Sequence, residues 1–248
     1  MILERIGDVA ILRINGGRAN AIDDALLAGV TKLRTEAEES GARAIVLTGY
    51  ERFFSAGLDL PALIELDRSG MERFMRVFAD TMLGVFTCPL PVVAAINGHA
   101  IAGGCVLALQ ADRRIMADGP YRIGLNEVQL GIGLPADVIE TARAQLSSAN
   151  LARVLLEGAL SLPAEALALG LVDAVVPADS LEARSLALAT ALARVSGPGF
   201  RQIKGALRRP TVEVARSRQD AEINGWLDSW FAPAIREKLI LAASKLKR

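Results

Sequence analysis

The sequence predicts an α/β fold followed by a helical C-terminal region. Short apolar runs alternate with segments of helical periodicity up to about residue 120, a pattern typical of largely parallel sheets with right-handed crossovers. From Leu181 onward the periodicity is almost wholly helical. A chain of 248 residues is long enough to bury a large core, so we expect it to fold without disulfides.

The first elements are apolar segments that end at turn residues. Residues 9–14 predict a strand that ends at the turn Asn15-Gly16-Gly17. A helix should begin near Asp23 and end at Ser40-Gly41, because apolar residues recur at helical spacing between these points. The fully apolar run 44–48 then predicts a second strand.

The middle of the chain continues the alternation. After residues 53–60, FFSAGLDL, helical spacing runs on and must end before Pro89. Residues 92–96 predict a third strand and residues 113–117 a fourth. Between them, residues 103–110 predict a short buried helix.

From about Pro135 the pattern is helical, interrupted by the strand-like run 171–176. We expect the tail to pack both on the core and on another subunit, because it carries extensive apolar faces. We therefore divide the chain into a core, residues 1–190, and a helical oligomerisation region, residues 191–248. The apolar faces comprise Leu192, Val195, Ile203, Leu207, Ile223, Trp226, Leu227, Trp230, Phe231, Ile235, Leu239 and Leu246.

The composition disfavours several classes of protein. Lys plus Arg and Asp plus Glu both number 28, so no basic surplus indicates nucleic acid as the partner. Cys88 and Cys105 form no CxxC pair, which favours reduced thiols. Charges at Glu4 and Arg5 disfavour an export signal, and no apolar run is long enough for a membrane span. A soluble, cytoplasmic protein without a membrane partner is expected.

The sequence offers few side chains of the kinds that serve as nucleophiles or metal ligands. His99 is the single histidine and directly follows a predicted buried strand, so we expect it to be structural, and we expect no metal site. The stretch AGGCVLALQ follows a strand and opens a helix, but it lacks the GxGxxG order of a dinucleotide site.

Glycines in two loops suggest that backbone N–H groups, rather than side chains, contact the reacting part of a ligand. A helix that begins at Gly103 exposes N–H groups that a ligand can approach closely. A turn at Gly57 can leave the Leu58 N–H pointing into a cleft. Two such donors that converge on one oxygen would form an oxyanion hole. The alternative is that both segments are tight turns needed only for packing.

Three motifs carry a resemblance to a known family. FSAGLDL at 54–60, AINGHAIAGG at 95–104 and IGLNEVQLGI at 123–132 together resemble the signatures of the crotonase, or enoyl-CoA hydratase/isomerase, superfamily. The first and third motifs and the tail around WLDSWFAPAIREKL are most similar to the mitochondrial-type Δ3,Δ2-enoyl-CoA isomerases of that superfamily.

The resemblance implies a spiral of ββα turns followed by helices that drive trimerisation, and hence a homotrimer or hexamer. The ligand would be an acyl-CoA thioester whose oxygen lies between the N–H groups of Leu58 and Gly103. No separate cofactor is implied, because coenzyme A is part of the substrate. Basic residues of the last helix, Lys238 or Lys245, would reach the CoA phosphates. The other implied substrate contacts are Arg18, Ala19, Ala56, Gly57, Asp59, Leu60, Val106 and Leu130.

The resemblance also indicates which reaction is favoured. The family's hydratases use two glutamates; here one position is Val106 and the other is Glu127. A single carboxylate suits transfer of a proton from C2 to C4, which moves a double bond from C3 to C2. Val106 would keep water away from the product, and Leu125, Val128 and Leu130 would join it in raising the pKa of Glu127.

Alternatives remain open for several residues. Glu127 could be an ordinary surface acid, and Asp59 is expected to cap the following helix rather than act in the chemistry. Asn126 either orients Glu127 or is a turn residue. Asp137 is the nearest acid that could complete a hydratase, and a non-catalytic acyl-CoA-binding or RNA-binding homologue is the third possibility.

Overall fold

A computed structural model describes residues 1–246, with Leu246 described by its backbone alone. The larger of its two sheets has six strands in the order β1-β2-β3-β5-β7-β9, all parallel except for the antiparallel pair β1 and β2. These strands are β1 (Ile2–Ile6), β2 (Val9–Arg13), β3 (Ala44–Thr48), β5 (Val92–Ile96), β7 (Arg113–Ala117) and β9 (Ala174–Val176).

A second, parallel sheet has three short strands, β4 (Phe53–Ser55), β6 (His99–Ile101) and β8 (Ile123–Gly124). Each of them follows a strand of the larger sheet and precedes a helix, so that β3 leads to β4, β5 to β6 and β7 to β8. The chain therefore climbs in a spiral of ββα turns, which confirms the predicted fold class.

Aspartate side chains fix where two of the helices begin. The Asp23 carboxylate accepts the Leu26 N–H at 2.8 Å and the Asp67 carboxylate accepts the Gly70 N–H at 2.7 Å, so that each caps a helix. In chain order the helices are η1 (Arg18–Asn20), α1 (Asp24–Glu39), α2 (Leu60–Leu63), α3 (Arg68–Phe86), α4 (Gly103–Leu109), α5 (Glu127–Leu130), α6 (Ala136–Gln145), α7 (Ser148–Glu157), α8 (Pro163–Leu169), η2 (Ala178–Ser180), α9 (Leu181–Val195), α10 (Pro198–Phe231) and α11 (Pro233–Leu246).

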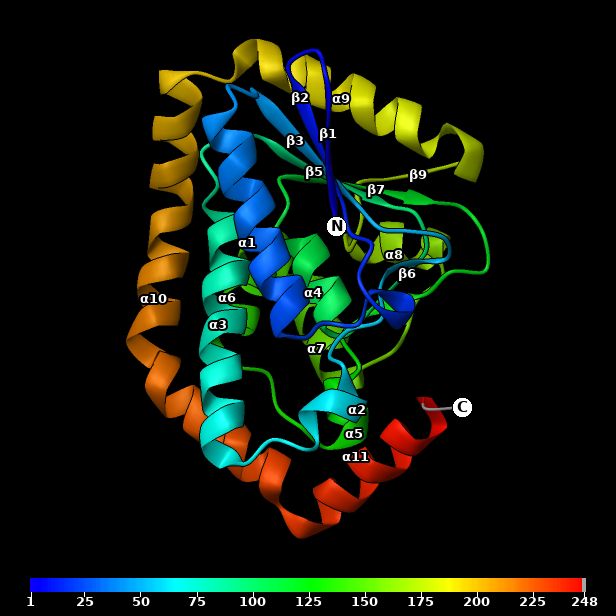
Figure 1. Ribbon diagram of the computed structural model, residues 1–248, viewed down its shortest axis with the longest axis vertical. Helices are drawn as coiled ribbons and strands as arrows, with labels where there is room; N and C mark the ends of the chain where they lie inside the picture. The colour runs from blue at the N-terminus through cyan, green and yellow to red at the C-terminus, as the bar shows by residue number, and fades with distance from the viewer. Residues whose placement is uncertain (247–248) are drawn as a thin grey trace.

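The inner strands β2, β3 and β5 of the larger sheet are apolar and buried at nearly every position, whereas the edge strand β1 is mostly exposed. Ile45 and Leu47 point into the main core, whereas Val46 between them joins a second cluster under α9. Figure 1 shows α9 lying across this second face. Continuous apolar runs such as AIVLT are therefore what a sheet covered on both sides requires.

The tail wraps the core. The long helix α10 lies beside α3 and α6, and α11 turns back against α2 and α5 (Figure 1). Trp226 and Trp230 are buried and stacked, with ring centroids 5.0 Å apart. Packing of the tail on the core is thus confirmed. None of the described helices is long and apolar enough to cross a membrane.

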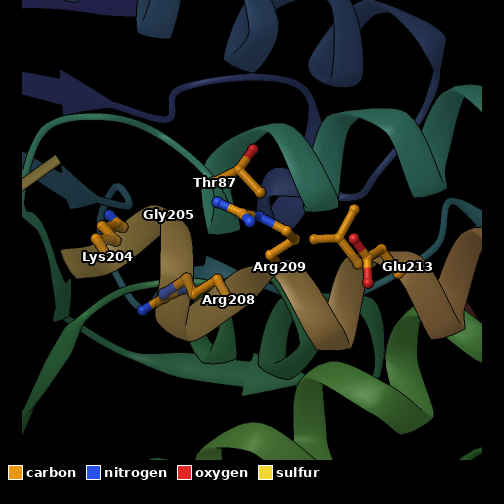
Figure 2. A pocket seen from close by; sticks show the side chains of 7 residues that line it. Thr87, Lys204, Gly205, Arg208, Arg209 and Glu213 are labelled. Carbon is orange, nitrogen blue, oxygen red and sulfur yellow. The ribbon is translucent and has the colours of Figure 1, made fainter. Parts of the chain in front are cut away.

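Two buried cations fasten α10 to the core. Lys204 Nζ and Arg208 Nη2 each donate to the Asp112 carboxylate at 2.6 Å. Arg208 also lies over the Phe86 ring, 4.0 Å from its centroid. Both side chains line a pocket of about 270 Å³. Figure 2 shows how they lie among its other lining residues. The residues that line the pocket are Thr87, Lys204, Gly205, Arg208, Arg209, Val212 and Glu213.

Several predicted features differ from the structure. The second sheet and β1 are absent from the prediction, and the strand predicted over 171–176 is only Ala174–Val176. The helical stretch after residue 60 is two helices, because Asp67 starts a new one. The proposed boundary at residue 190 falls inside α9. Cys88 and Cys105 are free thiols, as expected.

Candidate active site

The turn after β4 presents the Leu58 N–H. Gly57 has φ +86°, a value that favours glycine, and a Cβ atom there would lie 2.7 Å from the Ile101 carbonyl oxygen. On either side of Leu58, the Gly57 carbonyl accepts the Ile22 N–H at 2.7 Å and the Asp59 N–H donates to the Ile22 carbonyl at 3.0 Å. The Leu58 N–H therefore faces away from Ile22, and within residues 1–246 it donates to no backbone carbonyl.

The second donor comes from the start of α4. Ala102 has φ +51° and ψ −120°, an uncommon backbone conformation that turns the chain so that α4 begins at Gly103. The Ala102 N–H is held by the Gly124 carbonyl at 2.8 Å. Gly103 occupies the first position of the helix, where an N–H has no partner inside the helix and the positive end of the helix dipole lies.

The two donors come from separate loops but lie side by side. A Cβ atom built on Gly103 would lie 3.6 Å from the Leu58 nitrogen and 3.5 Å from the Gly57 Cα. A Cβ atom built on Gly57 would lie 3.2 Å from the Gly103 nitrogen. Both glycines are needed for this close approach of two backbone nitrogens from separate loops.

Glu127 is a buried carboxylic acid beside the first turn of α4. It opens α5 three residues after Gly124, is 9% exposed, and its Oε2 atom has no hydrogen-bond partner among the described residues. Desolvation raises the pKa of Glu127 to about 7, only partly offset by its own backbone N–H. Its negative charge in turn adds to the rise in the pKa of the buried Cys105 thiol, which places the carboxylate near α4.

Most of the apolar residues predicted around Glu127 are buried. Val106 and Leu125 are each 1% exposed, and Leu130 packs partly buried against the same core. The prediction that Val128 belongs to this apolar group is wrong, because Val128 is 45% exposed. Its place next to Glu127 in the chain turns it to the outer side of α5.

The other candidate acid lies in a different environment. Asp137 is also buried, and desolvation raises its pKa to about 7. The charges that bear on its pKa belong to Arg216 on α10 and Asp80 on α3. Neither Asp137 nor any other charge contributes to the shift of the pKa of Glu127 among the described residues. The structure therefore does not pair the two acids electrostatically.

The remaining predicted contacts surround the turn. The Ala56 N–H donates to the Ala19 carbonyl at 3.0 Å, which brings η1 and its exposed Arg18 to β4. Asp59 caps α2 by accepting the Ala62 N–H at 3.2 Å, as expected, and Leu60 opens that helix. Lys238 and Lys245 lie exposed on α11.

The structure also shows the surroundings of His99 and Asn126. His99 lies between the Phe53 and Tyr121 rings, and its Nδ1 atom accepts the Arg122 N–H at 3.1 Å, so its role is structural. The Oδ1 atom of Asn126 and the Oε2 atom of Glu127 are both buried without a partner in the described part of the chain. Asn126 therefore does not hold that oxygen of Glu127.

Sequence reasoning missed the polar residues behind the turn. Asn20 is 3% exposed and donates to the Phe53 and Phe54 carbonyls of β4. Ser55 is fully buried, donates to the Asn20 carbonyl and accepts the Gly57 N–H. The only available signal was an asparagine shortly after Gly16-Gly17, since Asn tolerates a left-handed backbone.

The chain is similar in sequence to several known proteins. The family model Enoyl-CoA hydratase/isomerase matches residues 4–236. The mitochondrial enoyl-CoA delta isomerase 1 of Homo sapiens is 30% identical over 242 residues, which covers 96% of this chain and 80% of that protein. The 2,3-dehydroadipyl-CoA hydratase of Escherichia coli is 34% identical over 217 residues, covering 87% and 84%.

The structural comparison agrees. The crystal structure of human mitochondrial delta3-delta2-enoyl-CoA isomerase superposes with a TM-score of 0.92 at 30% identity, and the alignment covers 99% of this chain and 97% of that one. Relatives named as isomerases and relatives named as hydratases thus both match most of the chain. The choice between the two reactions depends on the side chains at the site.

Proposed function

The chain belongs to the enoyl-CoA hydratase/isomerase family, and from this premise we propose that it is a Δ3,Δ2-enoyl-CoA isomerase. The reaction would move the C3 double bond of an acyl-CoA thioester to C2, a step in the breakdown of unsaturated fatty acids. One observation carries the choice of reaction: Glu127 is a buried acid whose Oε2 atom has no partner among the described residues and whose pKa is shifted by no neighbouring charge, whereas the position one turn into α4 is the aliphatic Val106.

The backbone would stabilise the charge that develops during the reaction. Removal of a proton from C2 sends its electron pair toward the carbonyl, and the dienolate that forms carries negative charge on the thioester oxygen. The N–H groups of Leu58 and Gly103 would donate to that oxygen. Fixed donors of this kind act most strongly on the transition state, because the negative charge is greater there than in the substrate.

Glu127 would carry the proton. Its carboxylate takes the proton from C2 and returns it to C4, after which the double bond lies between C2 and C3 and the thioester carbonyl is restored. A base whose pKa is near 7 is matched to this task, because it is ionised at neutral pH and still basic enough to take a proton. The acyl-CoA itself supplies the coenzyme, so no separate cofactor is needed.

Val106 would direct the outcome toward isomerisation. Hydration needs a second acid–base group that activates water beside the double bond. A valine that is 1% exposed offers no proton-transfer group, and it keeps the first turn of α4 dry. The alternative, hydration, gains support from the Escherichia coli relative and would have to recruit Asp137, which lies among groups of α3 and α10.

The experiment that tests this function is an assay of paired substrates. Purified protein is incubated with 3-enoyl-CoA and with 2-enoyl-CoA over several chain lengths, and products are separated by chromatography. We expect 2-enoyl-CoA from the first and little 3-hydroxyacyl-CoA from the second. Strong hydration that is lost in Asp137→Asn would favour the hydratase, and binding without turnover would favour a non-catalytic homologue.

The pH dependence should report Glu127. Because the base must be ionised, kcat/KM should rise with pH, reach half its maximum near pH 7 and level off above. The carboxylate of an exposed glutamate would instead give a midpoint near about 4.3. Stopped-flow measurement of kcat/KM from acidic to mildly alkaline pH distinguishes the two, and a flat profile would contradict the assignment.

We also propose that the chain forms a homotrimer or a dimer of trimers. Ile203 and Leu207 lie one turn apart on the outer side of α10 and are 65% and 75% exposed, and Val195 on α9 is 64% exposed. A second copy would bury this apolar area. Analytical ultracentrifugation should give three or six chains per particle for the wild type and fewer for Leu207→Glu; a wild-type monomer would contradict the proposal.

A further inference from the structure

We propose that Asn20 and Ser55 are positioning residues that hold the Leu58 N–H in place for the reaction. They touch neither reacting carbon, and they act through hydrogen bonds that fix the turn at Gly57. The inference rests on the proposed function, because it assumes that Leu58 donates to a thioester oxygen.

Asn20 ties the loop after β2 to β4. It is 3% exposed, and its Nδ2 atom donates to the Phe53 carbonyl at 3.1 Å and to the Phe54 carbonyl at 3.2 Å. Its Oδ1 atom accepts the Gly16 N–H at 3.1 Å. The side-chain amide is thus used at both ends, so its orientation is fixed.

Ser55 passes this constraint to the turn. Its side chain is fully buried, and its hydroxyl donates to the Asn20 carbonyl at 2.7 Å. The Ser55 hydroxyl oxygen also accepts the Gly57 N–H at 3.2 Å. The hydroxyl proton is therefore committed to Asn20, and the hydroxyl is left as an acceptor for the residue that precedes Leu58.

Three further backbone groups around the turn also have hydrogen-bond partners. The Ala56 N–H donates to the Ala19 carbonyl, and the Gly57 carbonyl and the Asp59 N–H are both bonded to Ile22. These three groups, which point toward the Asn20 loop, thus each have a partner there. The Leu58 N–H faces away from Ile22, and its nitrogen would lie 3.6 Å from a Cβ atom built on Gly103. We infer that these bonds determine the direction of the Leu58 N–H.

The arrangement is held at a conformational cost that points to a function. Ala19 and Asn20 have φ of +59° and +52°, and neither is glycine. Non-glycine residues in this region cost free energy and persist where the surroundings fix them, often at active sites. Here the surroundings that fix them are the bonds to β4 and the turn, and the group they aim is the Leu58 N–H.

The test measures how strongly the bound thioester carbonyl is polarised. A saturated acyl-CoA labelled with carbon-13 at the carbonyl is bound to the wild type, to Ser55→Ala and to Asn20→Gly, and its C=O band is recorded by difference infrared spectroscopy. Glycine accepts the φ of position 20, so Asn20→Gly removes only the side-chain bonds. Thr48→Val is the matched control, because it removes a buried hydroxyl bond to the Ala95 carbonyl that joins β3 to β5.

We expect the band of the wild type and of Thr48→Val to lie well below its position in free acyl-CoA. In Ser55→Ala and Asn20→Gly it should move back toward that position, and kcat should fall about 10-fold to 100-fold, up to the loss expected for one oxyanion donor. The pH midpoint of kcat/KM should stay at the wild-type value, because Glu127 is untouched. A full wild-type band shift in both variants would overturn the role of Asn20 and Ser55 alone. An unshifted band in the wild type would overturn the oxyanion hole, and this inference with it.

Discussion

Glu127→Gln should lower kcat for 3-enoyl-CoA about 10³-fold, within the range that general acid–base groups contribute. The amide keeps the size of the side chain but cannot take a proton from C2. Acyl-CoA affinity should stay near the wild-type value, because the oxyanion donors belong to the backbone. Steady-state assay and isothermal titration with a saturated acyl-CoA measure the two effects separately, and normal turnover by this variant would contradict the assignment.

The same variant should be more stable than the wild type at high pH. Above the ordinary pKa of 4.5 the unfolded chain carries an ionised Glu127, whereas the folded chain keeps it protonated up to about pH 7. Stability of the wild type therefore falls as pH rises between these values and levels off above. In mildly alkaline buffer, urea unfolding should give Glu127→Gln a free energy of unfolding up to about 3 kcal/mol higher than that of the wild type. This difference should shrink as the pH falls toward 4.5. A constant difference would contradict the shift in pKa.

Gly57→Ala should lower kcat about 10²-fold or more by displacing one oxyanion donor. The added Cβ would lie 2.7 Å from the Ile101 carbonyl oxygen, which belongs to the backbone, so the turn must move. Because Leu58 follows directly, its N–H moves with the turn. The pH midpoint of kcat/KM should not change, since Glu127 lies on another element.

Gly170→Ala is the matched control for this change. Gly170 has φ +76°, so alanine meets the same backbone strain of about 1 kcal/mol, but nothing lies within 4 Å of the added Cβ. It closes α8 and is not among the residues of the candidate site. Thermal unfolding should show a loss of stability in both variants, with normal turnover only in Gly170→Ala. Equal turnover in the two would contradict the role of the turn.

The inner strands of the larger sheet could be predicted from the sequence because they are buried on both faces, whereas the mostly exposed β1 was missed. The runs 44–48 and 92–96 coincide with β3 and β5, since a strand buried on both sides is apolar at nearly every position. The run 113–117 coincides with β7, which is buried from its second residue on. The small sheet could not be predicted in this way. Strands of two or three residues, such as β8, show too little periodicity to be distinguished from a turn.

Some residues of the candidate site could likewise be predicted from the sequence, and others could not. Glycine at positions 57 and 103 signalled close approach of the backbone, and the structure brings the two loops together. Glu127 was identified only through its motif, because its burial depends on α4, α5 and the core around them. Asn20 and Ser55 were missed, since hydrogen bonds to distant main-chain groups leave no periodic pattern in the sequence.

In the proposed reaction one carboxylate transfers the proton from C2 to C4 of a bound thioester. Conversion of 3-enoyl-CoA deuterated at C2, in ordinary water, tests this transfer when the product is analysed by mass spectrometry and NMR. We predict 2-enoyl-CoA in which a measurable share of the C4 hydrogen is deuterium, because the buried Glu127 holds the label between the two steps. Product with only solvent hydrogen at C4 even in a single turnover, or 3-hydroxyacyl-CoA as the main product, would contradict it.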